Sequence, residues 1–199
     1  HRSQVSGAVG CNYSRVEPVG TPYQLWRRKV GLDEPKTETF AMKAVDYLED
    51  AVAQFWHDDT GREIIKSSAG DWLIRNNERP YLQVSPDRTY WLAGEKKNAS
   101  NKGVLNVDTQ MKISSDDLPK HWFCQVQYQL GVAELKEGSL AWLCSGREFG
   151  YKDLFFVPDF YAWIVEEVEK FWRDNIQGKK EPEATSVQDI LLKFNRHTD

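Results

Sequence analysis

Apolar and polar residues alternate over most of the segment between Gly103 and Ile113, and this pattern limits the fold more than any other. Successive side chains of a β-strand point to opposite faces of the sheet, so the segment predicts one strand with two unlike faces. Its apolar positions are Leu105, Val107, Met111 and Ile113, and its polar positions are Asn106, Asp108, Gln110 and Lys112. One face belongs to the core, and the other belongs to solvent or to chemistry.

The segments around this strand predict helices that cover a sheet. Thr21 caps and Pro22 opens a first helix. A long helix follows from Thr39 to about Phe55, with a buried stripe of Ala41, Val45, Leu48, Val52 and Phe55. Further strands are predicted at 81–84, 90–93, 139–144 and 151–157, and further helices at 118–133, 158–175 and 186–194. This order predicts an α/β or α+β fold with a mixed central sheet.

Size and charge restrict the classes of protein that remain. With 199 residues, 40% of them hydrophobic, one domain over residues 1–199 is expected, with 178–199 as a linker and C-terminal helix. No apolar run approaches the roughly 20 residues that span a bilayer, and no signal pattern opens the chain, so we expect a cytoplasmic protein. A net charge of −4 excludes indiscriminate coating of nucleic acid but allows a local basic groove, for which Arg27-Arg28-Lys29 is a candidate.

The turn Pro86-Asp87 precedes the polar-faced strand. Hydrolysis of a phosphodiester with a hard cation needs carboxylates at the end of one strand and in the middle of its neighbour. The turn and the strand have the sequence form of that arrangement. Taken alone, Pro-Asp is a common turn dipeptide and indicates little.

Several segments, in order along the chain, resemble the phage-recombinase (YqaJ-like) exonuclease family, of the lambda exonuclease type. Thr21-Pro22-Tyr23-Gln24-Leu25-Trp26 is nearly the family's Thr-Pro-Tyr-x-Leu-Trp helix, and Val84-Ser85-Pro86-Asp87 is similar to its Ala-Ser-Pro-Asp-Gly strand end. The other similar segments are Ser3 to Gly10, Tyr47-Leu48-Glu49-Asp50, Gln125-Val126-Gln127-Tyr128 and Phe171-Trp172 with Pro182 to Asp189. Their ordered agreement is far more specific than any one of them.

The resemblance implies a PD-(D/E)XK nuclease with a restriction-endonuclease-like core. Such an enzyme would degrade linear duplex DNA from its ends, 5′ to 3′, with Mg²⁺ as cofactor and Mn²⁺ as a substitute. It also implies a single-strand-annealing partner protein, a homotrimer, and a phage or prophage gene expressed in a bacterial cell.

The candidate site residues divide into four groups. Asp87 and Asp108 would bind the metal ion, Glu49 and Gln125 would position its water molecules, and Gln110 or Lys112 would assist the attacking water. Ser3, Arg27 and Arg28 would hold the DNA.

The chain departs from the family in the polar-faced strand. Where the family has Glu-x-Lys, this sequence has Asn106-Val107-Asp108. In one interpretation the acid has moved two residues along the same face, and Asp108 binds the metal. In the other the site is impaired, because a neutral amide is a poorer ligand for a hard cation, and the protein is a DNA-end-binding or assembly subunit. Arg88 stands where the family has Gly.

Overall fold

A computed structural model describes residues 20–33, 40–65, 73–93, 102–108, 118–144 and 146–194. Within these ranges the side chains of Ala41, Met42, Val45, Asp46 and Asp108 remain outside the description. The elements are α1 (Pro22–Lys29), α2 (Phe40–Thr60), β1 (Ile64–Ile65), β2 (Ile74–Arg75), β3 (Gln83–Val84), β4 (Arg88–Trp91), β5 (Lys102–Asp108), α3 (Lys120–Ala133), β6 (Glu137–Cys144), β7 (Glu148–Phe155), α4 (Pro158–Phe171), the π-helix η1 (Trp172–Gln177) and α5 (Val187–Phe194).

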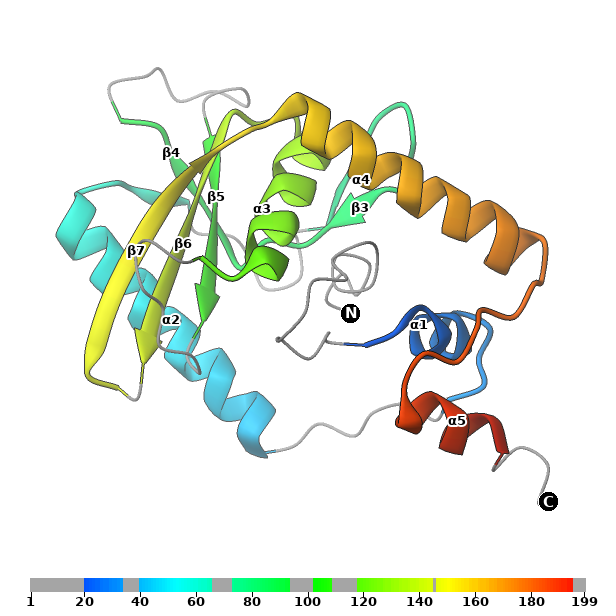
Figure 1. The fold of residues 1–199 in the computed structure, drawn as a ribbon. Coiled ribbons are helices and arrows are strands. Elements are labelled where there is room, and N and C mark those ends of the chain that lie inside the picture. Colours follow the sequence, from blue (N-terminus) through cyan, green and yellow to red (C-terminus); the bar gives the residue numbers. More distant parts are fainter. Residues whose placement is uncertain are drawn as a thin grey trace.

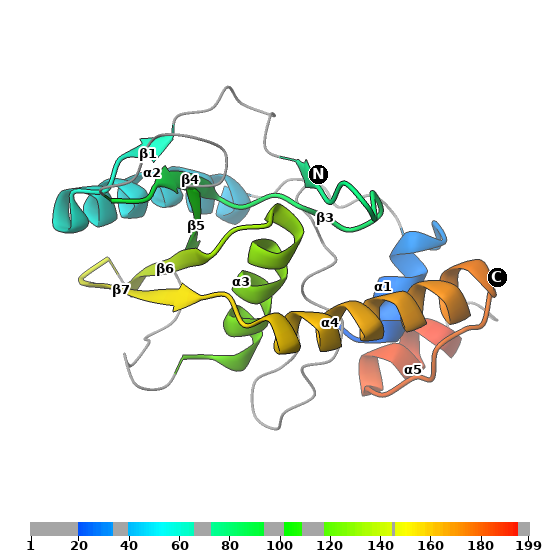
Figure 2. The ribbon, with the colours of Figure 1, turned by 90° about the horizontal axis from the view of Figure 1, so that it is seen from above.

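The predicted mixed sheet with helices around it is confirmed. Five strands form one sheet in the order β1-β4-β5-β6-β7, and β2 pairs with β3 in a separate hairpin. Helix α2 covers one face of the large sheet and α3 the other, while α1, α5 and the end of α4 lie together beside these layers (Figures 1 and 2). None of the helices in the described ranges is long and apolar enough to cross a membrane.

Strand β5 lies at the centre of the sheet. It pairs antiparallel with β4, where Arg88 is opposite Leu105, and parallel with β6, where Asn106 is opposite Leu140. A parallel pair needs a crossover connection, and α3 supplies it between β5 and β6. The predicted alternation is confirmed over the observed length of the strand: Val104 faces α3 and Leu105 faces α2.

The face that α2 buries differs from the predicted one. Val52, Ala53 and Trp56 are buried against the sheet, whereas Leu48 and Phe55 are 41% and 46% exposed, so the predicted stripe is wrong at those two positions. Trp56 decides the rotation of the helix. Its indole N–H donates to the Ser139 hydroxyl at 2.9 Å, and its ring packs 4.7 Å from that of Tyr90.

Several other elements differ in their bounds from the predicted ones. The short strands β1 and β2 were not predicted, β3 covers only the end of the predicted strand at 81–84, and the last helix of the core continues past Phe171 as η1. The hairpin of β2 and β3 packs on α3 and α4 through Leu82, Val84 and Tyr128. This packing fixes the chain immediately before Pro86-Asp87.

Helix α3 is held against α4 at a glycine. A Cβ added to Gly131 would lie 2.3 Å from ring carbons of Tyr161, so the close approach of the two helices requires the missing side chain. Gly131→Ala is therefore expected to destabilise the fold by about 1–3 kcal/mol through overpacking, as measured by urea unfolding. Combining it with Tyr161→Leu should recover part of the loss. Equal stability of Gly131→Ala and wild type would contradict this packing.

Candidate active site

Asp87 is fixed to the central strand. Its Oδ2 accepts a hydrogen bond from the Val107 backbone N–H at 2.9 Å, just beyond the point where the ladder between β4 and β5 ends at Arg88 and Leu105. Pro86, which precedes it, is buried and has no N–H to donate. The Asp87 carboxylate thus lies beside β5 near Asn106, at the place where the sequence predicts a catalytic acid.

Helix α2 reaches the same turn. Arg88 forms an ion pair with Asp50 of α2 and also donates from its guanidinium to the Asp87 carbonyl at 2.5 Å. Glu49, the neighbour of Asp50, is only 6% exposed. Arg88 therefore has a local role, which the family's glycine could not perform: it joins the helix that carries Glu49 to the turn that carries Asp87.

The side chain of Asn106 is held by two glutamines of α3. Its Nδ2 donates to Gln129 Oε1 at 2.7 Å, and its Oδ1 accepts from Gln125 Nε2 at a longer 3.4 Å. Asn106 and Gln129 are 3% and 2% exposed. These contacts place the predicted Gln125 in the same cluster as Asn106, and we call Asn106, Gln125 and Gln129 the amide cluster.

Gln129 was not predicted as a site residue. Its signal in the sequence is its position four residues after Gln125, which places both side chains on one side of a helix. A buried amide needs partners for both its donor and its acceptor, and Asn106 with two glutamines meets that need without any charge. Position 106 thus carries a neutral side chain, which is held by two neutral glutamines of α3.

The remaining predicted catalytic residues cannot be placed. The backbone of Asp108 ends β5, but its side chain lies outside the described part, as do Gln110 and Lys112. Among the described residues, no three His, Cys, Asp or Glu side chains are grouped as a metal site. Asp87 and Asp108 carry carboxylate oxygens, and Mg²⁺ takes one or two carboxylates with waters and substrate phosphates, so these residue types fit that ion.

Comparison with known proteins identifies the family. The profile of the YqaJ-like viral recombinase domain matches residues 2–136. This chain belongs to the YqaJ-like viral recombinase family. No protein of curated function matches its sequence.

Solved structures show the same fold. The alkaline exonuclease LHK-Exo from Laribacter hongkongensis matches with a TM-score of 0.58 at 13% identity, covering 88% of this chain and 83% of the exonuclease. LHK-Exo in complex with dAMP matches with a TM-score of 0.57 at 14% identity and the same coverage. At this identity the likeness shows that the chain has the fold of these exonuclease structures.

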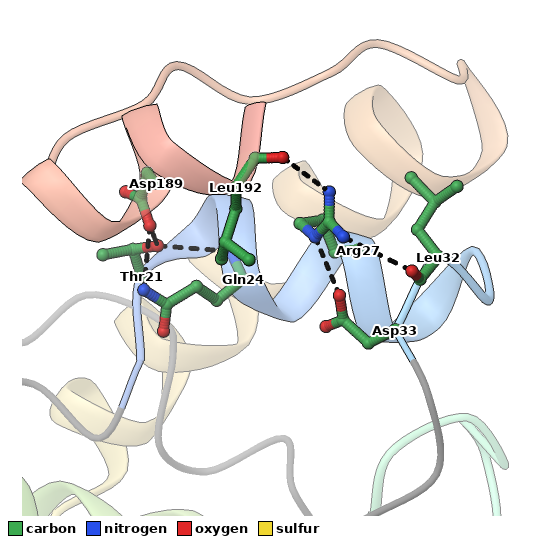
Figure 3. A network of polar contacts seen from close by, with 7 residues as sticks. All are labelled: Thr21, Gln24, Arg27, Leu32, Asp33, Asp189 and Leu192. Atoms are coloured by element: carbon green, nitrogen blue, oxygen red, sulfur yellow. Dashed lines mark hydrogen bonds and ion pairs between the residues drawn. The ribbon is translucent and has the colours of Figure 1, made fainter. Parts of the chain in front are cut away.

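The two arginines predicted to hold DNA have different surroundings in this YqaJ-like chain. Arg27 is 7% exposed, and its guanidinium donates to Asp33 at 2.8 Å and to the Leu32 and Leu192 carbonyls at 3.3 Å (Figure 3). Its guanidinium thus has a structural role inside the protein, and its contact with DNA stays a prediction.

Arg28 differs from its neighbour. Its Nε is buried, and among the described residues it has no hydrogen-bond partner. A guanidinium with an unpaired donor is suited to an anion, since buried polar groups are otherwise paired. Ser3, the third predicted DNA ligand, lies outside the described residues.

Asp189 of α5 is a fully buried carboxylate that joins the two ends of the described chain (Figure 3). Its Oδ1 accepts from the Thr21 hydroxyl at 2.7 Å and from Gln24 Nε2 at 2.9 Å, and its Oδ2 accepts from the backbone N–H groups of Thr185 and Ser186. Burial alone would raise the pKa of Asp189, but these hydrogen bonds outweigh it and hold the pKa below its usual value.

Removing the acceptor in the amide cluster tests its contribution to stability. Gln129→Leu leaves the buried Asn106 Nδ2 without its short hydrogen bond and should cost about 1–3 kcal/mol of unfolding free energy. Gln125→Leu is the matched control and should cost less, because its bond to Asn106 is longer. Adding Asn106→Leu to Gln129→Leu should recover part of the loss. A larger effect at Gln125 would contradict the arrangement.

The low pKa of Asp189 predicts how stability depends on pH. A carboxylate whose folded pKa lies below the unfolded value of about 3.9 stabilises the fold fully above that pH and loses the effect as pH falls through the folded pKa. The difference in unfolding free energy between wild type and Asp189→Asn should therefore be largest near neutral pH and shrink below about pH 4. Urea unfolding at a series of pH values measures it. A difference that grows in acid would disprove the assignment.

Proposed function

We propose that this protein is a metal-dependent exonuclease that degrades linear duplex DNA from its ends in the 5′-to-3′ direction. The observation that carries the proposal is the Asp87 carboxylate, fixed by the Val107 N–H beside the central strand of a YqaJ-like fold. In that place an acid can bind a hard cation next to a phosphodiester. The mononucleotide held in one LHK-Exo structure is the kind of product that an exonuclease releases.

Asp87 and Asp108, with a main-chain carbonyl of β5, would hold Mg²⁺, and Mn²⁺ would substitute for it. When bound, the ion activates water and neutralises charge that develops on the phosphate. Glu49, buried on α2, and Gln125, in the amide cluster, would orient water molecules at the site. Gln110 or Lys112 would assist the attacking water.

DNA would be gripped locally, because a net charge of −4 provides no general attraction to phosphate. Arg28 is the described residue that we assign to the backbone of the DNA end, since it is partly exposed where Arg27 is buried and its Nε has no partner within the described structure. Ser3 would contact the terminal phosphate. The proposed setting is a bacterial cytoplasm, with a single-strand-annealing protein as partner and a homotrimer as the assembled form.

Asp87→Asn separates charge from structure at the site. An asparagine oxygen can still accept from the Val107 N–H, so the fold should persist while the negative charge is lost. We expect digestion of 5′-phosphorylated linear duplex with Mg²⁺ or Mn²⁺ to fall by about 100-fold or more, the scale of one electrostatic contact to a transition state. The same duplex with one end blocked measures direction, and a closed circular plasmid should remain intact.

Wild-type protein that is folded and yet digests no duplex with either cation would refute the exonuclease proposal. The amide cluster makes this a real alternative, because Asn106 is neutral where the family's strand has an acid. In that event, binding to DNA ends that is unchanged by EDTA would indicate the DNA-end-binding or assembly subunit.

A further inference from the structure

Helix α5 is bound to α1 by polar contacts over a long sequence separation. The Asp189 carboxylate accepts hydrogen bonds from Thr21 and Gln24, and the Leu192 carbonyl accepts one from Arg27. Three residues of α1 or its cap therefore contact one short helix (Figure 3). The side of α5 that holds Asp189 is thus engaged with α1. Apolar residues of α5 are exposed instead: Val187, Ile190, Leu191 and Phe194.

The Thr21 hydroxyl takes part in two hydrogen bonds at the start of α1. Thr21 caps the helix by accepting from the Gln24 N–H at 3.2 Å, and the same hydroxyl donates to Asp189. Asp189 is itself fixed at the start of α5, where its own N–H donates to the Ser186 hydroxyl at 3.1 Å and its carboxylate accepts from the Ser186 N–H. This reciprocal pair is a capping box, which leaves the carboxylate little freedom.

Arg28 is one turn beyond Gln24 on α1, so the two side chains project from the same side of the helix. Gly20, just before the cap, lies next to both: a Cβ built on it would be 3.4 Å from Gln24 Oε1 and 3.5 Å from the Arg28 guanidinium. Gln24, which donates to Asp189, and the Arg28 guanidinium are therefore neighbours at the first turn of α1.

We propose that α5 is a clamp on α1, and that Asp189 is a positioning residue which sets Arg28 to receive a phosphate of the DNA end. The inference rests on the proposed binding of DNA ends, but not on cleavage. Arg27 connects the far part of the clamp, because it bonds both to Leu192 of α5 and to Asp33 beyond α1. Without these contacts α1 would still form but would lose its fixed orientation relative to α5.

The charge of Asp189 and its role in the clamp predict opposite effects on DNA binding. Removing a negative charge from a protein of net charge −4 would by itself strengthen binding to DNA. The clamp predicts the opposite: Asp189→Ala should weaken binding to a 5′-phosphorylated duplex end by about tenfold, the scale of one lost charge-assisted hydrogen bond. Fluorescence anisotropy in EDTA measures the dissociation constant without any turnover.

A double-mutant cycle with Arg28→Ala tests whether Asp189 acts through Arg28. If it does, Asp189→Ala should have no further effect on DNA binding in the Arg28→Ala background. Gln24→Met, which removes only one of the contacts to Asp189, is the milder variant if Asp189→Ala fails to fold. Asp174→Asn, at an exposed ion pair with Arg173, is the charge-matched control and should bind DNA at least as tightly as wild type does.

Hydrogen exchange supplies a readout that does not need DNA. Asp189→Ala, or Gln24→Met in its place, should raise amide exchange in residues 21–30 while α3 and β6 keep their protection. Unchanged exchange in α1 would overturn the clamp, and so would weakened binding that persists equally in the Arg28→Ala background. Wild-type protein that does not bind DNA ends would overturn the link to DNA. Wild-type protein that binds ends with the expected coupling but cuts nothing would refute the exonuclease and leave the clamp standing.

Discussion

The hydrogen bond from the Val107 N–H to Asp87 organises the site. The chain enters β4 through Pro86, which cannot donate to a neighbouring strand, and the ladder between β4 and β5 begins two residues later, at Arg88. Beyond that point the backbone N–H of Val107 in β5 donates to the Asp87 side chain instead of to a neighbouring strand. This hydrogen bond gives a partly buried amide its partner and places a carboxylate beside the central strand. Strand β5 and the turn at Asp87 are thereby fixed relative to each other, and the amide cluster joins the same strand to α3.

Alternation and capping signals predicted the parts of the fold that depend on local sequence. Thr21-Pro22 does open α1, and Leu105 and Asn106 do face opposite sides of the sheet. The rotation of α2 was not predictable from periodicity, because Phe55 and Trp56 are adjacent large apolar residues. The choice depends on Ser139, which accepts the indole N–H from another element.

Arg27 and Arg28 show the same limit at the site. In the sequence they are equivalent members of a basic cluster, and composition gives no reason to separate them. Their tertiary contacts differ. Arg27 donates to the Leu192 carbonyl and to the Asp33 carboxylate, while Arg28 Nε has no partner in the described part of the chain. A contact between residues that are 165 positions apart leaves no trace in local spacing.

The amide cluster has an energetic consequence for a site of this kind. Position 106 is 3% exposed and lies beside the acid Asp87, which is bonded to the next residue of β5. A carboxylate at position 106 would lose its hydration and would repel Asp87, and both effects would destabilise the fold. Asn106 avoids both costs by bonding to Gln129 and Gln125. The side chain at position 106 is thus satisfied without any charge, and the proposed metal site would draw its negative charge from Asp87 and Asp108.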